Sequence, residues 1–189
     1  MPPTFVVSCH ADTGFRRHRL RHLPDGSFEG HLDNFAGVHA VMGAYFSGRM
    51  DLPRTRIELT WGEEVDMEGA RQVAETLGPD DLVVVVDVTG VPTARDITIE
   101  KCGPPTLQAL VRRALHGLSY ELFADCPDPI SDCDECDVYG EVVPRVFFLG
   151  IPCTGGDYNA GMVRCRPASL AAASEALVHL ARVFHGLEP

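Results

Sequence analysis

The 189-residue chain lacks any apolar run that approaches the roughly 20 residues of a membrane-spanning helix. Its first residues, MPPTFVVSCHAD, also lack the basic segment followed by a long apolar stretch that defines a secretory signal peptide. Internal repeats, low-complexity tracts and linker-like segments are missing as well. These absences, together with the length, predict one domain over residues 1–189 that works in the cytoplasm without a membrane partner.

Basic residues are scarce, because 16 Lys and Arg stand against 27 Asp and Glu, for a net charge of −11 at pH 7. Nucleic-acid binding needs Lys and Arg clustered on one face, so nucleic acid is excluded as a partner. An acidic surplus alone usually indicates only solubility, but many of these carboxylates fall in motifs, which makes a cation the partner to test. The seven cysteines are an odd number, and without a secretion signal we expect reduced thiols, most of them buried.

Five segments rich in Val, Ile, Thr and Phe and bounded by Gly, Pro or Asp predict strands: 4–9, 56–61, 81–88, 97–101 and 143–150. Four segments with apolar residues at helical spacing predict helices: 34–50, 68–77, 106–123 and 168–184. Strands that alternate with helices indicate a layered α/β fold with a mostly parallel sheet. The segment LVVVVDV is apolar at nearly every position, which predicts a central strand covered on both faces.

Polar motifs follow the predicted strands or begin a predicted helix. They are His10 and Asp12 after the first strand, Asp33 before the first helix, the pair Glu63 and Glu64 after the second strand, and Asp87 near the end of the third. Ligands of parallel sheets bind at the carboxyl ends of the strands, so we expect these side chains on one rim. So many carboxylates together would repel one another strongly without a cation. Because carboxylates and a neutral imidazole suit zinc, manganese or cobalt, we predict a divalent metal site.

Each motif taken singly has a plainer explanation. A His-x-Asp triplet occurs often by chance, Asp33 could cap a helix, and Glu63-Glu64 could be acids in the first turn of a helix. Their order along the chain and their common position at strand ends favour the metal site.

Four segments, SCHADTG, LDNFAGV, TWGEEVDMEGA and VVVVDVTG, resemble in this order the motifs of the co-catalytic zinc aminopeptidases and the related di-zinc carboxypeptidases and deacylases. The resemblance is greatest to the glutamyl and deblocking aminopeptidases. It implies a three-layer α/β/α sandwich with a mixed, mostly parallel central sheet, present here as the catalytic domain alone. It also implies a metal-dependent hydrolase, either an aminopeptidase or an amide deacylase, that acts on a peptide or small amide and is able to form a homo-oligomer.

The resemblance implies a role for each matched residue. Two zinc ions, or a single one, are expected, with manganese or cobalt as alternatives. The implied ligands are His10 and Asp87 on one ion, Glu64 on the other, and Asp33 as the bridge between them. Asp12 would orient the imidazole of His10. Glu63 would be the catalytic base that takes a proton from the attacking water.

The last histidine ligand of this family is missing here. The family places it shortly after an apolar strand that ends in Ile-Pro, where this chain reads FFLGIPCTGGDYNAG. Asp157 falls at that place and would be an oxygen ligand, which suits harder ions such as manganese or magnesium. The alternative is a damaged site in a degenerate, non-catalytic homologue that binds a metal or a peptide without hydrolysing it.

The segment of about twenty residues between His10 and Asp33 is expected to form a loop. It carries four arginines in an otherwise acidic chain: Arg16, Arg17, Arg19 and Arg21. A solvated or subunit-contacting loop is the plainer explanation. The alternative is substrate binding, in which Arg16 and Arg17 recognise a carboxylate near the metals.

The segment DCPDPISDCDECD combines acids with three cysteines, Cys126, Cys133 and Cys136. A structural zinc or a redox pair would use such thiols, but no second C-x-x-C accompanies the first, so this signal is weak. The family has an Asp-containing loop near the active site at about this place. We therefore expect an acid-rich loop, in which Asp132 or Asp134, together with Glu135, lines a substrate pocket.

Overall fold

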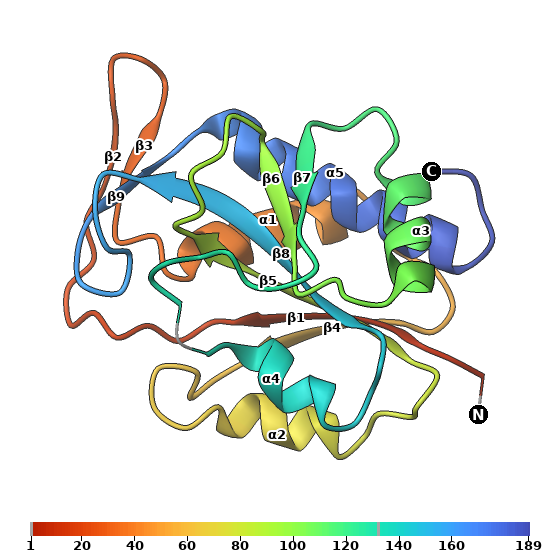
Figure 1. Ribbon diagram of the computed structural model, residues 1–189. Helices are drawn as coiled ribbons and strands as arrows, with labels where there is room; N and C mark the ends of the chain where they lie inside the picture. Colours follow the sequence, from red (N-terminus) through yellow and green to blue (C-terminus); the bar gives the residue numbers. More distant parts are fainter. Residues whose placement is uncertain (1, 132) are drawn as a thin grey trace.

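The computed structural model describes residues 2–131 and 133–189 (Figure 1). Within them, nine strands form one sheet in the order β2-β3-β9-β8-β5-β1-β4, with β6 against β8 and β7 against β6. The strands are β1 (Phe5–His10), β2 (Leu20–His22), β3 (Phe28–Gly30), β4 (Thr55–Thr60), β5 (Leu82–Thr89), β6 (Ile97–Glu100), β7 (Tyr120–Leu122), β8 (Val146–Thr154) and β9 (Val163–Cys165). The helices are α1 (Phe35–Phe46), α2 (Glu68–Ala74), α3 (Pro105–Ala114), α4 (Glu135–Gly140) and α5 (Pro167–Phe184).

The centre of the sheet is parallel. β4, β1, β5 and β8 run in one direction side by side, whereas β6 and β9 pair with β8 in the antiparallel sense. All eight residues of β5 are buried, as its unbroken apolar sequence predicted. The mixed, mostly parallel α/β sheet expected from the sequence is therefore confirmed.

Helices cover both faces of this sheet. Figure 1 shows α2 and α4 together on one side and α1 and α5 on the other, with α3 against α5. Alternate residues of β1 face opposite layers, since Phe5 and Val7 pack in the larger apolar core and Val6 in the smaller one. The structure thus has the expected three layers. Among the described residues, no helix combines the length and apolar character needed to cross a membrane.

The helix predicted over 106–123 is wrong in its second half. α3 ends at Ala114, and residues 120–122 form strand β7. Gly117 has a φ of 88°, a left-handed backbone conformation that glycine adopts without strain and that cannot continue a helix. Tyr120 and Leu122 then pair with Ile97 and Ile99 of β6. The alternation of these two apolar residues is too short to distinguish a strand from a helix, so the tertiary pairing decides.

The loop expected between His10 and Asp33 is partly a β-hairpin. β2 and β3 pair in the antiparallel sense around a turn that contains Gly26 at a φ of 84°. β3 pairs in turn with β9, so the hairpin extends the sheet beyond β8. Three-residue strands of mixed polarity carry no readable period, which is why the sequence did not reveal them.

The acid-rich segment expected to be a loop contains helix α4. Asp134 caps its first turn, because its carboxylate accepts a hydrogen bond from the Cys136 N–H (2.7 Å) and its N–H donates to Asp137 (3.1 Å). The following strand, β8, begins at Val146 and continues to Thr154, beyond the predicted 143–150.

Candidate metal centre

The candidate centre is built around His10, the last residue of β1. Its Nε2 lies 2.9 Å from Asp87 Oδ2 and 3.2 Å from Asp33 Oδ1. All three residues are buried, with exposed fractions of 1% for His10, 4% for Asp33 and 8% for Asp87. One imidazole N–H can donate a full hydrogen bond to only one of the two carboxylates. A cation bound between the two carboxylates and the nitrogen could interact with all three.

Asp33 reaches this point because Asn34, and not Asp33, caps helix α1. The Asn34 side chain accepts a hydrogen bond from the Gly37 N–H (2.9 Å) and donates to the Val86 carbonyl of β5 (2.8 Å). These two bonds hold the start of α1 against the sheet. The carboxylate of Asp33 is then free to face His10.

Glu63 and Glu64 approach His10 from the turn after β4. Gly62 enters that turn at a φ of 76°, and Gly69 packs so closely that a Cβ there would lie 2.5 Å from the Trp61 nitrogen. Ligand atoms of His10, Glu63 and Glu64 lie within 4.8 Å of one another, as do those of His10, Asp33 and Asp87. The imidazole is thus common to two groups that are each suited to a metal ion.

Burial and neighbouring charges shift the pKa values of His10, Asp87, Glu63 and Glu64. Burial opposes protonation of His10, but the charge of Asp87 and the contacts with both aspartates outweigh it and raise the pKa of His10 well above its usual range. Burial raises the pKa of Asp87 and also that of Glu64. Burial, reinforced by the charges of Asp87 and Asp33, raises the pKa of Glu63 to about 8. Each acid is therefore costly to ionise in the absence of a cation.

The second ring nitrogen of His10 faces Asp12. Nδ1 lies 3.5 Å from Asp12 Oδ1, and both atoms are buried without a hydrogen-bond partner. A carboxylate behind the non-ligating nitrogen is the usual outer partner of a metal-bound histidine. These two unpartnered atoms and the convergence at Nε2 fit an imidazole that binds a metal through Nε2.

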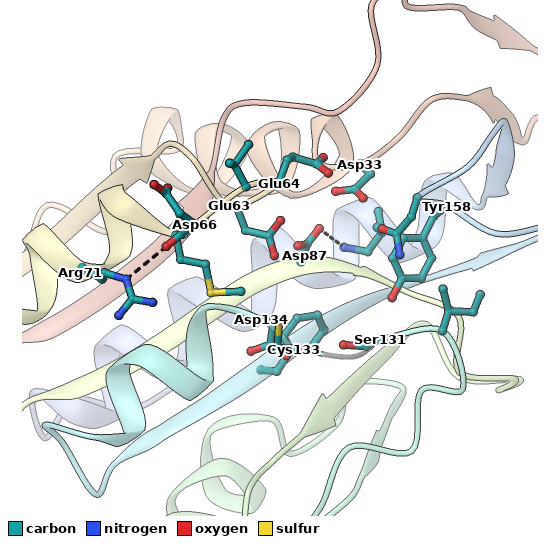
Figure 2. A pocket seen from close by; sticks show the side chains of 16 residues that line it. Asp33, Glu63, Glu64, Asp66, Arg71, Asp87, Ser131, Cys133, Asp134 and Tyr158 are labelled. Carbon is teal, nitrogen blue, oxygen red and sulfur yellow. Dashed lines mark hydrogen bonds between the residues drawn. The ribbon is translucent and has the colours of Figure 1, made fainter.

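A cavity of about 430 Å³ opens beside these residues (Figure 2). Asp33, Glu63, Glu64 and Asp87 line its inner wall, and Figure 2 shows their carboxylates pointing toward one another. The remaining wall includes apolar and thiol side chains as well as Asp66, Arg71, Ser131, Asp134 and Tyr158. The cavity is large enough for one or two amino-acid residues of a ligand.

Of the described residues expected to form a substrate pocket, only Asp134 is found in the cavity lining. Asp134 lines the cavity, but its carboxylate is already engaged with Lys101 Nζ (2.9 Å) and with the cap of α4. Glu135 is 1% exposed and lies beneath the rim. Asp132 lies outside the described residues. Arg16 and Arg17 are exposed on the segment before β2, and their side chains form no ion pair with a described residue.

Asp157 is not brought into either group. It is exposed in the loop between β8 and β9, and its Oδ1 accepts a hydrogen bond from the Asn159 N–H (2.9 Å). The neighbouring Tyr158 and Asn159 line the cavity instead. The loop therefore reaches the site, while the aspartate that would replace the family's histidine lies outside the cavity lining.

A buried polar network below the rim was not recognised from the sequence. Glu135 accepts hydrogen bonds from Ser8 Oγ of β1 (2.8 Å) and from Thr60 Oγ1 of β4, and Ser8 also bonds the Tyr139 hydroxyl (2.8 Å). These bonds join α4 to the two strands that end at His10 and at the Glu63 turn. Hydroxyl residues inside apolar strands, such as Ser8 in FVVSCH, were the signal that could have revealed it.

The three cysteines of the acid-rich segment do not come together in a metal group among the described residues. Cys136 is buried in the smaller core, whereas Cys126 and Cys133 are exposed.

No protein-family model matches this chain, and no curated protein matches it in sequence. Solved structures do match it in fold. The dodecameric PhTET1-12s superposes with a TM-score of 0.72 at 14% identity, over 87% of this chain and 53% of that chain. A TET aminopeptidase from the marine sediment archaeon Thaumarchaeota archaeon SCGC AB-539-E09 gives a TM-score of 0.70 at 12% identity, over 86% of this chain and 51% of that one.

An aminopeptidase of the M18 family from Thermotoga maritima gives a TM-score of 0.64 at 14% identity, over 86% of this chain and 48% of that one. The chain therefore spans about half the length of the structures that it matches. Identities this low establish the fold, and the expected structural kinship is confirmed at that level: this chain has the fold shared by the TET-type and M18-family aminopeptidases.

Proposed function

We propose that the chain is a metal-dependent hydrolase that removes the N-terminal residue of a peptide or the acyl group of a small amide. The observation that carries this proposal is the convergence of Asp33 and Asp87 on one nitrogen of His10, with Glu63 and Glu64 beside the same imidazole. The fold shared with TET and M18-family aminopeptidases supports the reaction class.

The proposed ligands are His10 and Asp87 for one ion, Glu64 for a second, and Asp33 between the two. Zinc is the first candidate, with manganese or cobalt as alternatives, because the donors are one imidazole and several carboxylates. When bound, the ions supply Lewis-acid polarisation of the scissile carbonyl and lower the pKa of the attacking water.

Glu63 is the proposed catalytic base. It would accept the proton of the attacking water and return it to the leaving amine, a role that typically contributes about 10²–10⁴-fold to the rate. Asp12 would hold the His10 ring through Nδ1, at the 3.5 Å separation.

Charge around the cavity supports a peptide substrate. The acidic lining, with Asp66 beyond the candidate ligands, favours a substrate with a positively charged amino terminus. Arg16 and Arg17, exposed and without a described ion-pair partner, are the proposed partners of a substrate carboxylate.

A second candidate function is non-catalytic binding of a metal or a peptide. The position of Asp157 favours it, because this exposed residue bonds its own loop and leaves the Glu64 side of the site one ligand short of the family pattern. Retention of Glu63 favours the hydrolase, since a binding protein needs no base beside the metal.

Metal content and turnover distinguish the two functions. The protein is stripped with a chelator, dialysed against zinc, manganese or cobalt, analysed for bound metal, and assayed on aminoacyl-p-nitroanilides and acetylated amino acids. Bound metal with turnover that is lost in Glu63→Gln, while the metal content is unchanged, supports the hydrolase. Bound metal without turnover for any ion supports the binding protein. Absence of stoichiometric metal binding contradicts the hydrolase and the metal-binding form of the second candidate, so that only peptide binding is left. Glu188→Gln, at the exposed C-terminal end, is the matched control.

A further inference from the structure

The outer edge of the sheet at β4 is open. β4 ends the strand order and pairs only with β1 among the described residues. Phe5 N–H donates to the Arg54 carbonyl and Ala11 N–H to the Thr60 carbonyl, so the backbone groups of even-numbered residues face β1. Because these groups alternate along a strand, the N–H and C=O of Ile57 and Leu59 point away from the sheet. An unpaired edge of this kind is a template for another strand.

An apolar surface accompanies this edge. A groove of about 650 Å³ runs between β4 and the end of α1, and its walls include Tyr45, Phe46, Ile57 and Leu59. Phe46 is 76% exposed, Tyr45 55% and Leu59 43%. Trp61, the only tryptophan, follows the strand and is 48% exposed. Large apolar side chains gathered beside an unpaired strand indicate a surface that another protein covers.

The sequence of β4 is complementary to itself in the antiparallel direction. If two copies pair with Ile57 opposite Ile57, then Arg56 of each copy stands opposite Glu58 of the other. Ile57 is suited to this position because its N–H and C=O both face outward and can form both bonds of a hydrogen-bonded pair. Arg56 and Glu58 then form a non-hydrogen-bonded pair, in which side chains approach most closely. Within one chain Arg56 already contacts Glu58 Oε1 (2.6 Å), so both side chains lie on the same face of the strand.

We propose that two copies of this chain dimerise through antiparallel pairing of their β4 strands, with Ile57 on the twofold axis. The pairing would join the two sheets into one and cover the apolar groove beside each strand. Since the two β4 strands run in opposite directions, the cavities beside His10 would lie toward opposite ends of the dimer. The proposal does not depend on the hydrolase function.

Charge reversal tests both the interface and its register. Arg56→Glu places two carboxylates opposite each other across the pairing, and Glu58→Arg places two guanidinium groups there, so each variant should dimerise at least about tenfold more weakly than the natural chain. The double variant R56E/E58R restores opposite charges and should dimerise normally. An equimolar mixture of the two single variants should form a heterodimer, because every facing pair is then of opposite charge. Arg113→Glu, an exposed reversal on α3, is the matched control.

Sedimentation velocity and light scattering over a range of protein concentrations give the dimerisation constant, and circular dichroism verifies that each variant folds. The proposal is supported by a dimer that each single reversal weakens and that mixing restores. A natural chain that stays monomeric at all concentrations overturns it. So does a dimer that both single reversals leave intact, or one that mixing does not restore although both variants are folded.

Discussion

The buried carboxylates of this protein fall into two groups with opposite surroundings. At the rim, Asp33 and Asp87 turn their oxygens toward one nitrogen of His10, at 3.2 and 2.9 Å. In the second group, Glu135 accepts hydrogen bonds from Ser8 and Thr60, and Asp128 accepts bonds from the Thr89 hydroxyl (3.0 Å), the Gly90 N–H (2.7 Å) and the Tyr158 hydroxyl (2.9 Å). Both groups are hidden from water, but the oxygens of Glu135 and Asp128 are each met by separate hydroxyl or backbone donors. Asp33 and Asp87 share one His10 nitrogen, and among the described residues only Asp87 has a further donor, the Val88 N–H (2.6 Å).

This difference distinguishes the candidate metal site from a structural network. Buried acids that are satisfied by hydroxyl and backbone donors stabilise the fold and need no other partner. Acids that face one another and a single imidazole keep much of their desolvation cost, and a divalent cation offsets it. The two groups therefore differ in the hydrogen-bond donors that surround their carboxylates, and not in burial or in the number of acids.

The largest effect is expected when one acid of each group is replaced and zinc affinity is measured. Asp87→Asn should weaken zinc binding by more than about 100-fold, beyond the 10–100-fold typical of an outer partner, because it removes a proposed ligand and its charge. Glu135→Gln should leave zinc affinity nearly unchanged, since Glu135 belongs to neither candidate metal group and its two oxygens are bonded to Ser8 and Thr60; the glutamine oxygen keeps one of these bonds, and its NH2 group can donate to the other hydroxyl. Competition titration against a chromophoric chelator measures both. Equal losses in the two variants would remove the distinction between the groups.

Glu100 is intermediate between the two groups, because it is buried but has a single hydroxyl donor. It allows the cost of burying an acid to be measured as a change in the free energy of unfolding. It is 1% exposed and accepts one hydroxyl bond, from Thr98 (2.6 Å), and burial raises its pKa from 4.5 to about 7. The folded chain therefore keeps this proton over a pH range in which the unfolded chain has lost it, so the free energy of unfolding falls as the pH rises from 4.5 through 7.

Glu100→Gln should abolish that part of the pH dependence. Compared with the natural chain, the variant should gain up to about 3 kcal/mol at pH 8 and nothing near pH 4.5. Urea unfolding at several pH values measures the difference, with Glu188→Gln as an exposed control. A constant offset between variant and natural chain across the whole range would contradict the assignment.

A smaller loss of zinc affinity is expected when Asp12, behind the imidazole of His10, is replaced. Asp12→Asn keeps the size of the side chain but removes the charge behind His10 Nδ1, and should weaken zinc binding by about 10–100-fold. The exposed Asp51→Asn is the matched control. Unchanged affinity in Asp12→Asn would show that Asp12 does not act through the imidazole, and the same titration would detect it.

The pH dependence of metal affinity tests the same site without a substitution. The pKa of His10 is raised well above its usual range in the metal-free chain, so the imidazole is protonated at neutral pH and a metal must displace that proton. Zinc affinity should rise with pH between 6 and 8 by about tenfold per unit for each proton displaced. Calorimetry in buffers of different ionisation enthalpy counts these protons directly. A flat profile would mean that the metal does not bind through His10.

Much of this protein could be predicted from its sequence because the decisive signals are local. Apolar strands such as residues 82–89 and the helical spacing of the last segment determine the α/β layers without reference to distant residues. The motif order from His10 to Asp87 places polar residues at strand ends, and parallel strands bring such ends to one rim. The sequence therefore determined the fold class and indicated a metal site on that rim.

Only the tertiary structure decided which residues meet. Short strands such as β7 form because a partner strand is present, and their own residues carry too little periodicity to specify them. Sequence register placed Asp157 at the site, but the path of the β8–β9 loop turns Tyr158 and Asn159 toward the cavity instead. The donors of Glu135 come from strands that lie 75 and 127 residues away in the chain, and the open edge of β4 exists only as part of a complete sheet. Such features depend on contacts between distant segments, which a linear pattern does not encode.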